Sequence, residues 1–476
     1  MTSAPAARGR GGDGVEFASV GALRRMVDRH EITVEEITRT SLERIDRLNS
    51  KLNAVVAMRA DAALAEAQAR DRLPPDDRGP LHGVPFTIKD VTETIDLPTT
   101  YGSLAFKDHR TDFDALVVAR LRRAGGILVG KTNTPELACE PVTRGQLFGE
   151  TLNPWAPDRT PGGSSGGAAA GLAAGMFTLA QGTDAGGSIR IPASCCGVVG
   201  LKPTRGRVTF APAAYEPWGG LLHNGPMARD VRDAAVMLEV MADRMADAGE
   251  RGEFRAACER HVRPMRVAYL DGPGVADLDA EVASAFADAL EVMEELGMEL
   301  VPGVPNFSLV LEPFATIAEV AFAAMAAQMT DEQLQQIGLT SMQLIARGRE
   351  IKAARYYAAL QDAHRESARV LRFWEQHDVL LTPTVPWVPP LRERLPASEE
   401  YEEKWAEYGT WEMFTSPFNV TGQPAISLPC RVRSSSGAPI GVQLVGRLDG
   451  EADLLTLGAA YEAAVNWASH PLEGVL

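Results

Sequence analysis

The chain has 476 residues, of which 45% are hydrophobic and 23% charged, which is enough for one large domain or two ordinary ones. Its net charge of −16 argues against a surface that binds nucleic acid and favours a soluble protein. No apolar run reaches the roughly 20 residues needed to cross a membrane, so we expect no membrane partner.

The ends and the cysteines narrow the class of protein further. Residues 1–14 are small, polar and glycine-rich, so we expect a disordered tail without a signal peptide, followed by a single domain over 15–476. The five cysteines form no CxxC pair, which disfavours a disulfide framework or a zinc site and fits the cytoplasm. No residues have the spacing of metal ligands, so neither a metal nor a cofactor is expected.

The first half of the chain alternates helical and strand patterns. Residues 15–71 are predicted to be helical, with a capping box over Thr33–Glu36. A short apolar strand then ends at Lys89, and α/β proteins concentrate their chemistry at the carboxyl ends of strands. Further elements in this half are predicted as helices over 112–124 and 168–174 and strands over 127–129 and 177–180.

The second half adds a long helical segment. Residues 307–376 are almost wholly helical in pattern and rich in Ala and Met, which indicates a helical insertion. The remaining predicted elements are helices over 230–243, 279–296 and 451–465, strands over 265–270, 378–381 and 441–445, and a loop with a short strand over 418–429. This alternation predicts an α/β fold with a mixed sheet.

Two motifs suggest other functions. Residues 125–132 (GGILVGKT) fit the P-loop pattern, but a P-loop needs a bare loop between a strand and a helix, whereas Ile127–Val129 is itself a strand and Pro135 follows. Residues 162–166 (GGSSG) fit the nucleophile elbow of α/β hydrolases. The proline-containing segment 153–157 before them cannot be the strand that an elbow requires. Both alternatives are therefore disfavoured.

The segment from Thr160 to Arg190 is the most informative one, because it holds nine glycines and three serines. Such glycine density marks places where the backbone takes unusual conformations or where a ligand approaches it closely. A serine beside such glycines can be a nucleophile with an oxyanion hole next to it.

With motifs elsewhere, this segment resembles the amidase signature family. The long signature runs from Gly162 to Val208. The other matching motifs are GVPFTIKD (83–90), GKTNTPE (130–136), LTPT (381–384), PFNVTGQP (417–424) and GVQLVG (441–446). The resemblance covers nearly the whole chain beyond the N-terminal tail and is weakest over 209–375.

The resemblance implies a central mixed β-sheet flanked by helices and a Ser–cis-Ser–Lys triad. Residue by residue, the triad corresponds to Lys89, Ser164 and Ser188, with Ser164 held by a cis peptide bond. The backbone N–H groups of the 185–188 loop would form the oxyanion hole, with Ala185, Gly186 and Gly187 beside the nucleophile. Candidate substrate contacts or loop supports are Asn133, Gly163, Ser165, Thr183, Asp184 and Arg190.

The residue types suit amide hydrolysis. Lys89 can act as a base only when neutral, and burial at the end of an apolar strand would lower its pKa from about 10.4 toward 7–8. A hydroxyl both donates and accepts, so Ser164 can relay a proton from Ser188 to Lys89. The expected partner is a small amide, carbamate or aryl ester, including nylon-type oligomers, and a homodimer is left open.

Composition alone suggests which residues wall the substrate site: Phe210, Tyr215, Trp218, Leu222, Phe314, Met325 and Met329. One alternative function is the glutamine-hydrolysing subunit of a tRNA-dependent amidotransferase, although those chains usually carry Gln where this one has Ile191. The other is an amidase fold without activity, which the intact triad positions disfavour.

Overall fold

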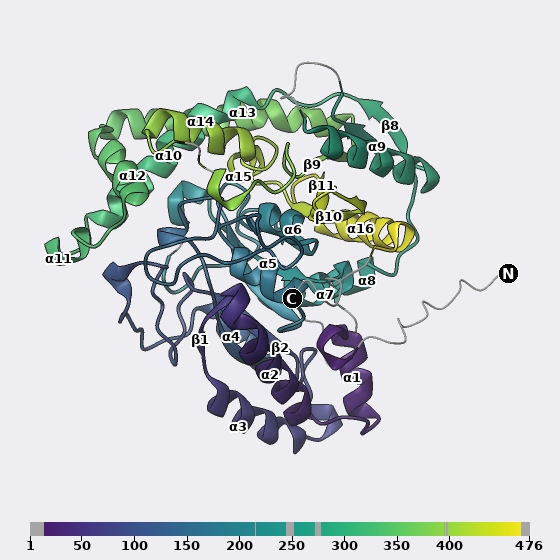
Figure 1. Cartoon of the computed structure of the whole chain (residues 1–476). Helices are drawn as coiled ribbons and strands as arrows, with labels where there is room; N and C mark the ends of the chain where they lie inside the picture. Colours follow the sequence, from purple (N-terminus) through teal and green to yellow (C-terminus); the bar gives the residue numbers. More distant parts are fainter. Residues whose placement is uncertain are drawn as a thin grey trace.

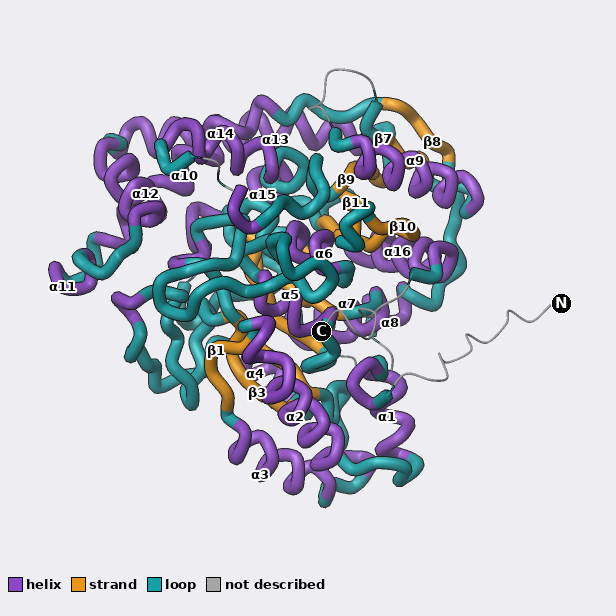
Figure 2. Tube along the Cα trace, viewed as in Figure 1, coloured by secondary structure: helices purple, strands orange, loops and turns teal. Residues whose placement is uncertain are grey.

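One mixed β-sheet runs through the protein. The computed structural model describes residues 14–214, 216–243, 252–271, 278–394, 396 and 398–467, so most of the predicted N-terminal tail lies outside the described residues. In these residues the sheet has the strand order β1-β3-β2-β4-β6-β5-β10-β11-β9-β7-β8 (Figure 2). The strands are β1 (Val55–Met58), β2 (Pro85–Lys89), β3 (Ile127–Thr132), β4 (Leu179–Asp184), β5 (Val199–Lys202), β6 (His223–Ala228), β7 (Arg266–Tyr269), β8 (Glu299–Pro302), β9 (Val379–Pro383), β10 (Ala425–Arg433) and β11 (Pro439–Val445).

The sheet is mixed, as the sequence predicts. Strand β2 is parallel to β3 and β4, and β7 is parallel to β8 and β9. The other neighbouring pairs are antiparallel.

Helices flank this sheet (Figure 1). In chain order they are α1 (Val20–Asp28), α2 (Val34–Leu52), α3 (Ala60–Asp71), α4 (Leu116–Arg123), α5 (Gly166–Ala173), α6 (Arg190–Cys196), α7 (Val231–Met241), α8 (Glu253–Ala257), α9 (Ala280–Glu295), α10 (Ser308–Ala326), α11 (Asp331–Leu334), α12 (Leu339–Glu350), α13 (Ala353–Leu371), α14 (Tyr401–Trp411), α15 (Pro417–Thr421) and α16 (Glu451–Val465). The predicted capping box at Thr33 and Glu36 is present at the start of α2.

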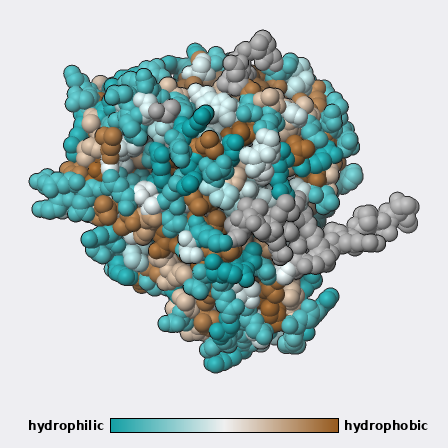
Figure 3. Space-filling model, in the orientation of Figure 1, coloured by the Kyte–Doolittle hydropathy of each residue, from teal (hydrophilic) through white to brown (hydrophobic). Residues whose placement is uncertain are grey.

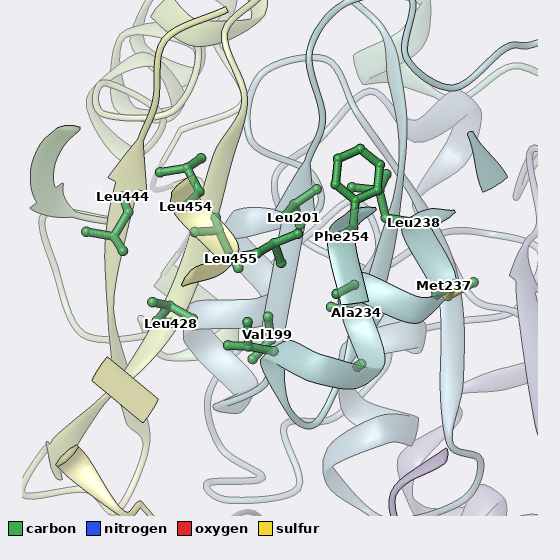
Figure 4. Packing of buried hydrophobic residues seen from close by; sticks show 14 of the residues in the cluster. Val199, Leu201, Ala234, Met237, Leu238, Phe254, Leu428, Leu444, Leu454 and Leu455 are labelled. Atoms are coloured by element: carbon green, nitrogen blue, oxygen red, sulfur yellow. The ribbon is translucent and has the colours of Figure 1, made fainter. Parts of the chain in front are cut away.

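The core is formed by apolar side chains on both sides of the sheet. Figure 4 shows one part of it, where Val199 and Leu201 of β5 lie between leucines of β10, β11 and α16 and side chains of α7 and α8. These side chains are almost fully buried, and each such aliphatic residue contributes about 1.5–3 kcal/mol through removal from water. A second cluster joins α2 and α5 to β3 and β4.

The helical insertion predicted over 307–376 is confirmed as α10–α13. In Figure 1 these helices gather with α14 at one end of the molecule, opposite α1–α3. Among the described helices, α10 alone is long and apolar enough to cross a membrane, with a mean hydropathy of 1.6. This differs from the expectation that no segment of the chain has the length and apolar composition to do so. Helix α10 packs against α12 and α13.

On the face shown in Figure 3, apolar side chains form small separate patches among polar ones. Leu339 and Tyr357 are large apolar residues that are more than half exposed. Both belong to the helices of the insertion.

Three stretches differ from the prediction. Residues 15–71 are not wholly helical, because the apolar run Val55–Met58 pairs with β3 at the edge of the sheet. Strand β6 was not predicted, since its Gly and Pro residues are poor strand formers, yet it lies between β4 and β5. Residues 417–421 form helix α15 rather than a loop, and β10 is nine residues long.

Candidate active site

The parallel pairing of β2 with β4 brings two chain segments together. Ile88 of β2 lies beside Gln181 of β4, so Lys89 at the end of β2 faces the last residues of β4. Because parallel strands end at the same edge, the loop that follows β4 begins next to Lys89. That loop, residues 185–188, carries Ser188 and leads into α6.

Lys89 is fully buried and held by hydroxyl groups. Its Nζ donates to Ser164 Oγ at 2.6 Å and to Thr183 Oγ1 at 3.0 Å. Burial lowers the pKa of Lys89 to about 7, a shift that the nearby carboxylate of Asp184 opposes. A large fraction of this lysine is therefore neutral near pH 7 and able to accept a proton.

Ser164 lies on the bend that leads into α5, and the Gly163–Ser164 peptide bond is cis, as the family resemblance implies. Thr143 fixes this bend, because its hydroxyl donates to Gly162 O and accepts from Gly166 N. Gly163 has no room for a side chain, since a Cβ there would lie 2.6 Å from the backbone of Val142.

The loop over 185–188 has the features of an oxyanion hole. Among the described residues, the N–H groups of Ala185, Gly186, Gly187 and Ser188 donate no hydrogen bond. Gly187 has a φ of +141°, and a Cβ there would lie 2.3 Å from Thr415 Oγ1. That hydroxyl donates to Gly186 O at 2.5 Å and fixes the peptide's orientation. Four unpaired N–H groups beside a serine can stabilise a developing negative charge.

Ser188 is nearly buried, with 9% of its surface exposed, and its hydroxyl makes no hydrogen bond within the described structure. The sequence predicts a Ser164 hydroxyl that bridges Lys89 and Ser188. The Lys89 side of this bridge is present, whereas no bond between the two serine hydroxyls is formed here.

A buried ion pair supports the same loop. Arg190 binds Asp184 in a bidentate manner, with Nη2–Oδ1 at 2.8 Å and Nε–Oδ2 at 2.9 Å, and both side chains are fully buried. Burial alone would raise the pKa of Asp184, but Arg190 and Asn419 hold it well below its usual value. Arg190 also donates to Asn419 Oδ1, Gln443 Oε1 and Thr415 O. Both residues thus act as loop supports.

Two further sequence candidates, Ser165 and Asn133, hold loops in place. Ser165 donates its N–H to Ser188 O and its hydroxyl to Thr183 O. The Asn133 amide donates to Thr151 Oγ1 at 3.0 Å, and its Oδ1 accepts from Thr134 N.

Ser188 opens into a cavity of about 470 Å³ between the 185–188 loop and helices α10 and α14. Its walls are mainly apolar and aromatic, through Trp218, Phe314, Phe322, Trp405 and Met413 among others. The sequence correctly placed Trp218 and Phe314 there.

The other residues predicted to wall the substrate site are not found in the described lining of this cavity. Phe210 and Leu222 line a separate, smaller cavity. Met325 and Met329 pack against the cluster around Phe322 and Leu344 instead of facing the cavity. Tyr215 lies outside the described residues.

Glu412, at the carboxyl end of α14, was missed by the sequence reasoning. It lines the cavity, and a Cβ placed on Gly186 would lie 2.7 Å from its Oε2. Burial raises the pKa of Glu412 to about 8; the charge of Asp184 adds to this rise and Arg190 opposes it. No motif singled out the surrounding residues 401–413, and only the fold brings them over the loop.

In the part of the chain that the structure describes, no group of three or more His, Cys, Asp or Glu residues is arranged to hold a metal ion. The arrangement of Lys89, the serines and the cavity is that of a hydrolase that uses a serine nucleophile.

Comparisons with known proteins agree with this class. The model of the family described as Amidase matches residues 36–455. The chain is 33% identical to an acylamidase of Rhodococcus erythropolis, over 95% of this chain and 97% of that protein. It is also 35% identical to a glutamyl-tRNA(Gln) amidotransferase subunit from Chloroflexus aurantiacus, over 94% and 97%.

Comparison with solved structures also agrees with this class. The structure of 6-aminohexanoate cyclic dimer hydrolase with substrate superposes with a TM-score of 0.87 and 32% identity, covering 97% of this chain and all of that one. The chain therefore belongs to the amidase signature family. It is a hydrolase that acts on the carbon–nitrogen bonds of amides.

Proposed function

We propose that this protein hydrolyses the amide bond of a small, largely apolar substrate through Ser188, Ser164 and Lys89. The observation that carries the proposal is the buried contact of 2.6 Å between Lys89 Nζ and Ser164 Oγ, beside the apolar cavity into which Ser188 opens. Acylation of Ser188 and hydrolysis of the acyl-enzyme both need a group that can take and return a proton.

In the first step, Ser188 Oγ attacks the carbonyl carbon and the C=O π electrons move onto the oxygen. The Ser188 proton passes to Ser164 Oγ, while Ser164 gives its own proton to neutral Lys89 Nζ. The lowered pKa of Lys89 makes this transfer feasible near neutral pH. The free N–H groups of the 185–188 loop would receive the oxyanion.

In the second step, the oxyanion re-forms the carbonyl and the C–N bond breaks. Lys89 returns a proton through Ser164 to the leaving nitrogen, which departs as a neutral amine. Water then attacks the Ser188 ester by the same route, and the Ser188 hydroxyl is restored when the acid leaves. Every proton is returned, so the cycle needs no external oxidant, reductant or cofactor.

The cavity supports the substrate class. Its aromatic and aliphatic walls favour the burial of apolar acyl or aryl groups. Carbamates and aryl esters pass through a similar tetrahedral intermediate and belong to the same proposal.

Glutamine hydrolysis is the second candidate, since a relative with 35% identity belongs to an amidotransferase. Free glutamine carries an α-carboxylate, and its binding favours a cationic partner. Among the described lining residues of the cavity there is no Lys, Arg or His, whereas there are three glutamates. This charge pattern favours amides without a carboxylate.

The test is a substrate panel with variants. Propionyl 4-nitroanilide, a 4-nitrophenyl ester, a phenyl carbamate and glutamine would be compared by kcat/KM. Ser188→Ala and Lys89→Ala should abolish anilide turnover while the proteins stay folded. Cys139→Ala is the matched control, because its thiol is a second potential nucleophile in the wall of the cavity.

Mass spectrometry after a short reaction with the ester should find the acyl group on Ser188. Undiminished anilide turnover in Ser188→Ala, or an acyl group on Cys139, would overturn the assignment. Ammonia release from glutamine as the dominant activity would overturn the substrate class.

A further inference from the structure

The cavity beside Ser188 holds three carboxylates that differ in their partners. Glu140 accepts from Tyr408 OH at 2.7 Å, with Arg144 at 3.9 Å. Glu319 accepts from Tyr401 OH at 2.5 Å and lies 3.6 Å from Arg347 Nε. Within the described structure, no hydrogen bond or ion pair reaches the carboxylate of Glu412. Glu140 and Glu319 are thus held by neighbouring side chains, whereas the carboxylate of Glu412 is available to a ligand.

Glu412 lies against the loop that would hold the substrate carbonyl. The distance of 2.7 Å from its Oε2 to a Cβ position on Gly186 places the carboxylate over that peptide. Phe314 of α10 lies next to it, with Cζ 3.2 Å from the same position. An acidic group without a partner in the described structure, at the edge of a mainly apolar wall, can orient a ligand as well as bury it.

The position of Glu412 also determines which part of the substrate it faces. The leaving nitrogen must face Ser164 and Lys89 to receive its proton, and Glu412 contacts neither of them. The carbonyl oxygen would accept from the N–H groups of the 185–188 loop. The acyl group next to the carbonyl carbon would then lie beside Gly186 and Glu412.

We propose that Glu412 binds a primary ammonium group on the acyl portion of the substrate, so that the preferred substrates are aminoacyl amides without a free carboxylate. This inference rests on the proposed amide hydrolysis at Ser188. A desolvated carboxylate gains a charge-assisted hydrogen bond from an ammonium group, and the absence of cations among the described lining residues removes competition for it. Burial raises the pKa of Glu412 to about 8, so the binding of an ammonium group at pH 7 would release the carboxyl proton of Glu412 to solvent.

The experiment uses three anilides of nearly equal size. Alanine 4-nitroanilide carries an ammonium group, propionyl 4-nitroanilide carries hydrogen in its place, and malonyl 4-nitroanilide carries a carboxylate. At pH 7, kcat/KM should fall in that order. Glu412→Gln should lower kcat/KM for the alanine anilide about tenfold, through KM, and leave the propionyl anilide within about twofold.

Glu319→Gln is the matched control, because Glu319 lines the same cavity but is already paired with Tyr401. It should leave the ratio between the alanine and propionyl anilides unchanged. Equal kcat/KM for these two anilides in the wild type, or an equal loss for both in Glu412→Gln, would overturn the inference.

Binding separates this inference from the proposed function. Alanine anilide and propionanilide would be titrated calorimetrically into the Ser188→Ala protein, with and without Glu412→Gln. Tighter binding of alanine anilide that requires Glu412 supports the inference even if no anilide is hydrolysed. Hydrolysis that depends on Ser188, with no preference in either assay, supports the proposed function and rejects the role of Glu412.

Discussion

Lys89 Nζ lies 2.6 Å from Ser164 Oγ, although the two residues are 75 positions apart in the chain. Strand β2 carries the lysine, and the bend before α5 carries the serine. A second hydroxyl, Thr183 Oγ1 at 3.0 Å, holds the amine from the end of β4. The amine is thus fixed by two hydroxyl groups and by no carboxylate in direct contact, which is the environment of a lysine that can lose its proton.

Replacing Ser164 by Ala should interrupt the proton path while Ser188 and Lys89 remain in place. We expect kcat for propionyl 4-nitroanilide to fall by roughly 10²–10⁴-fold, as is typical when a proton-transfer group is lost. Ser165→Ala is the neighbouring control, since the Ser165 hydroxyl donates to the backbone at Thr183 O, at 3.3 Å, and to no catalytic side chain among the described residues. Its loss should be less than about tenfold, and similar losses in both variants would argue against the relay.

The pH dependence of kcat/KM should report the ionisation of Lys89. Only the neutral amine accepts a proton, and its pKa is about 7. Activity should therefore rise as the pH increases through about 7 and level off above it. A stopped assay with propionyl 4-nitroanilide between pH 5.5 and 9 would measure this.

Glu412 also titrates in this range, with a pKa of about 8, so the assignment needs a control. Glu412→Gln should retain the rising limb near pH 7. Loss of the limb in that variant would assign it to Glu412 instead of Lys89. Asp184 stays ionised throughout, because its pKa lies well below its usual value.

Much of the site could be predicted because its motifs are local. The lysine ends an apolar strand, and each serine lies in its own glycine cluster. The resemblance of these short motifs to the amidase signature family then selected Lys89, Ser164 and Ser188. The fold class followed from the alternation of helix and strand patterns. The helical insertion followed from a long segment with few strand formers.

The features that could not be predicted from the sequence depend on contacts between segments that are distant in the chain. Pro226 has no N–H and would normally argue against an inner strand, yet β6 pairs with β4 through Gln181 and Pro226. Gly182–Asp184 looked like loop but completes β4. Glu412 reaches Gly186 only because α14 packs over the site, and no local pattern encodes that contact.

Breaking the buried pair of Asp184 and Arg190 should strongly destabilise the fold. Asp184→Asn leaves the guanidinium of Arg190 buried without its carboxylate partner, which typically costs about 3–5 kcal/mol. Since the folded-state pKa of Asp184 is depressed, its contribution is fully present above about pH 4 and is lost only in stronger acid. Urea unfolding at pH 7 would measure the loss.

The control for that variant is an exposed pair of the same type. Arg266 Nε lies 3.2 Å from Glu299 Oε1, with both side chains about half exposed or more. Glu299→Gln should change the free energy of unfolding by less than about 1 kcal/mol. Equal effects of the two substitutions would mean that breaking the buried pair costs no more than breaking a surface one.

Gly187→Ala should impair both the loop and catalysis. Its φ of +141° is rarely adopted by residues with a side chain, and the added Cβ would lie 2.3 Å from Thr415 Oγ1. Moving that hydroxyl would release Gly186 O and turn the N–H groups of the loop away from the developing oxyanion. We expect kcat to fall by about 10²-fold or more, the scale of losing an oxyanion-hole donor, with KM changing little.

Gly206→Ala is the control that introduces backbone strain without a steric clash. Gly206 also has a positive φ, +78°, but a Cβ there would meet nothing within 4 Å. This variant should lose roughly 1–2 kcal/mol of stability from strain and keep kcat within about twofold. If Gly187→Ala lowers kcat no more than Gly206→Ala does, the geometry of the 185–188 loop does not determine the rate and the oxyanion hole lies elsewhere.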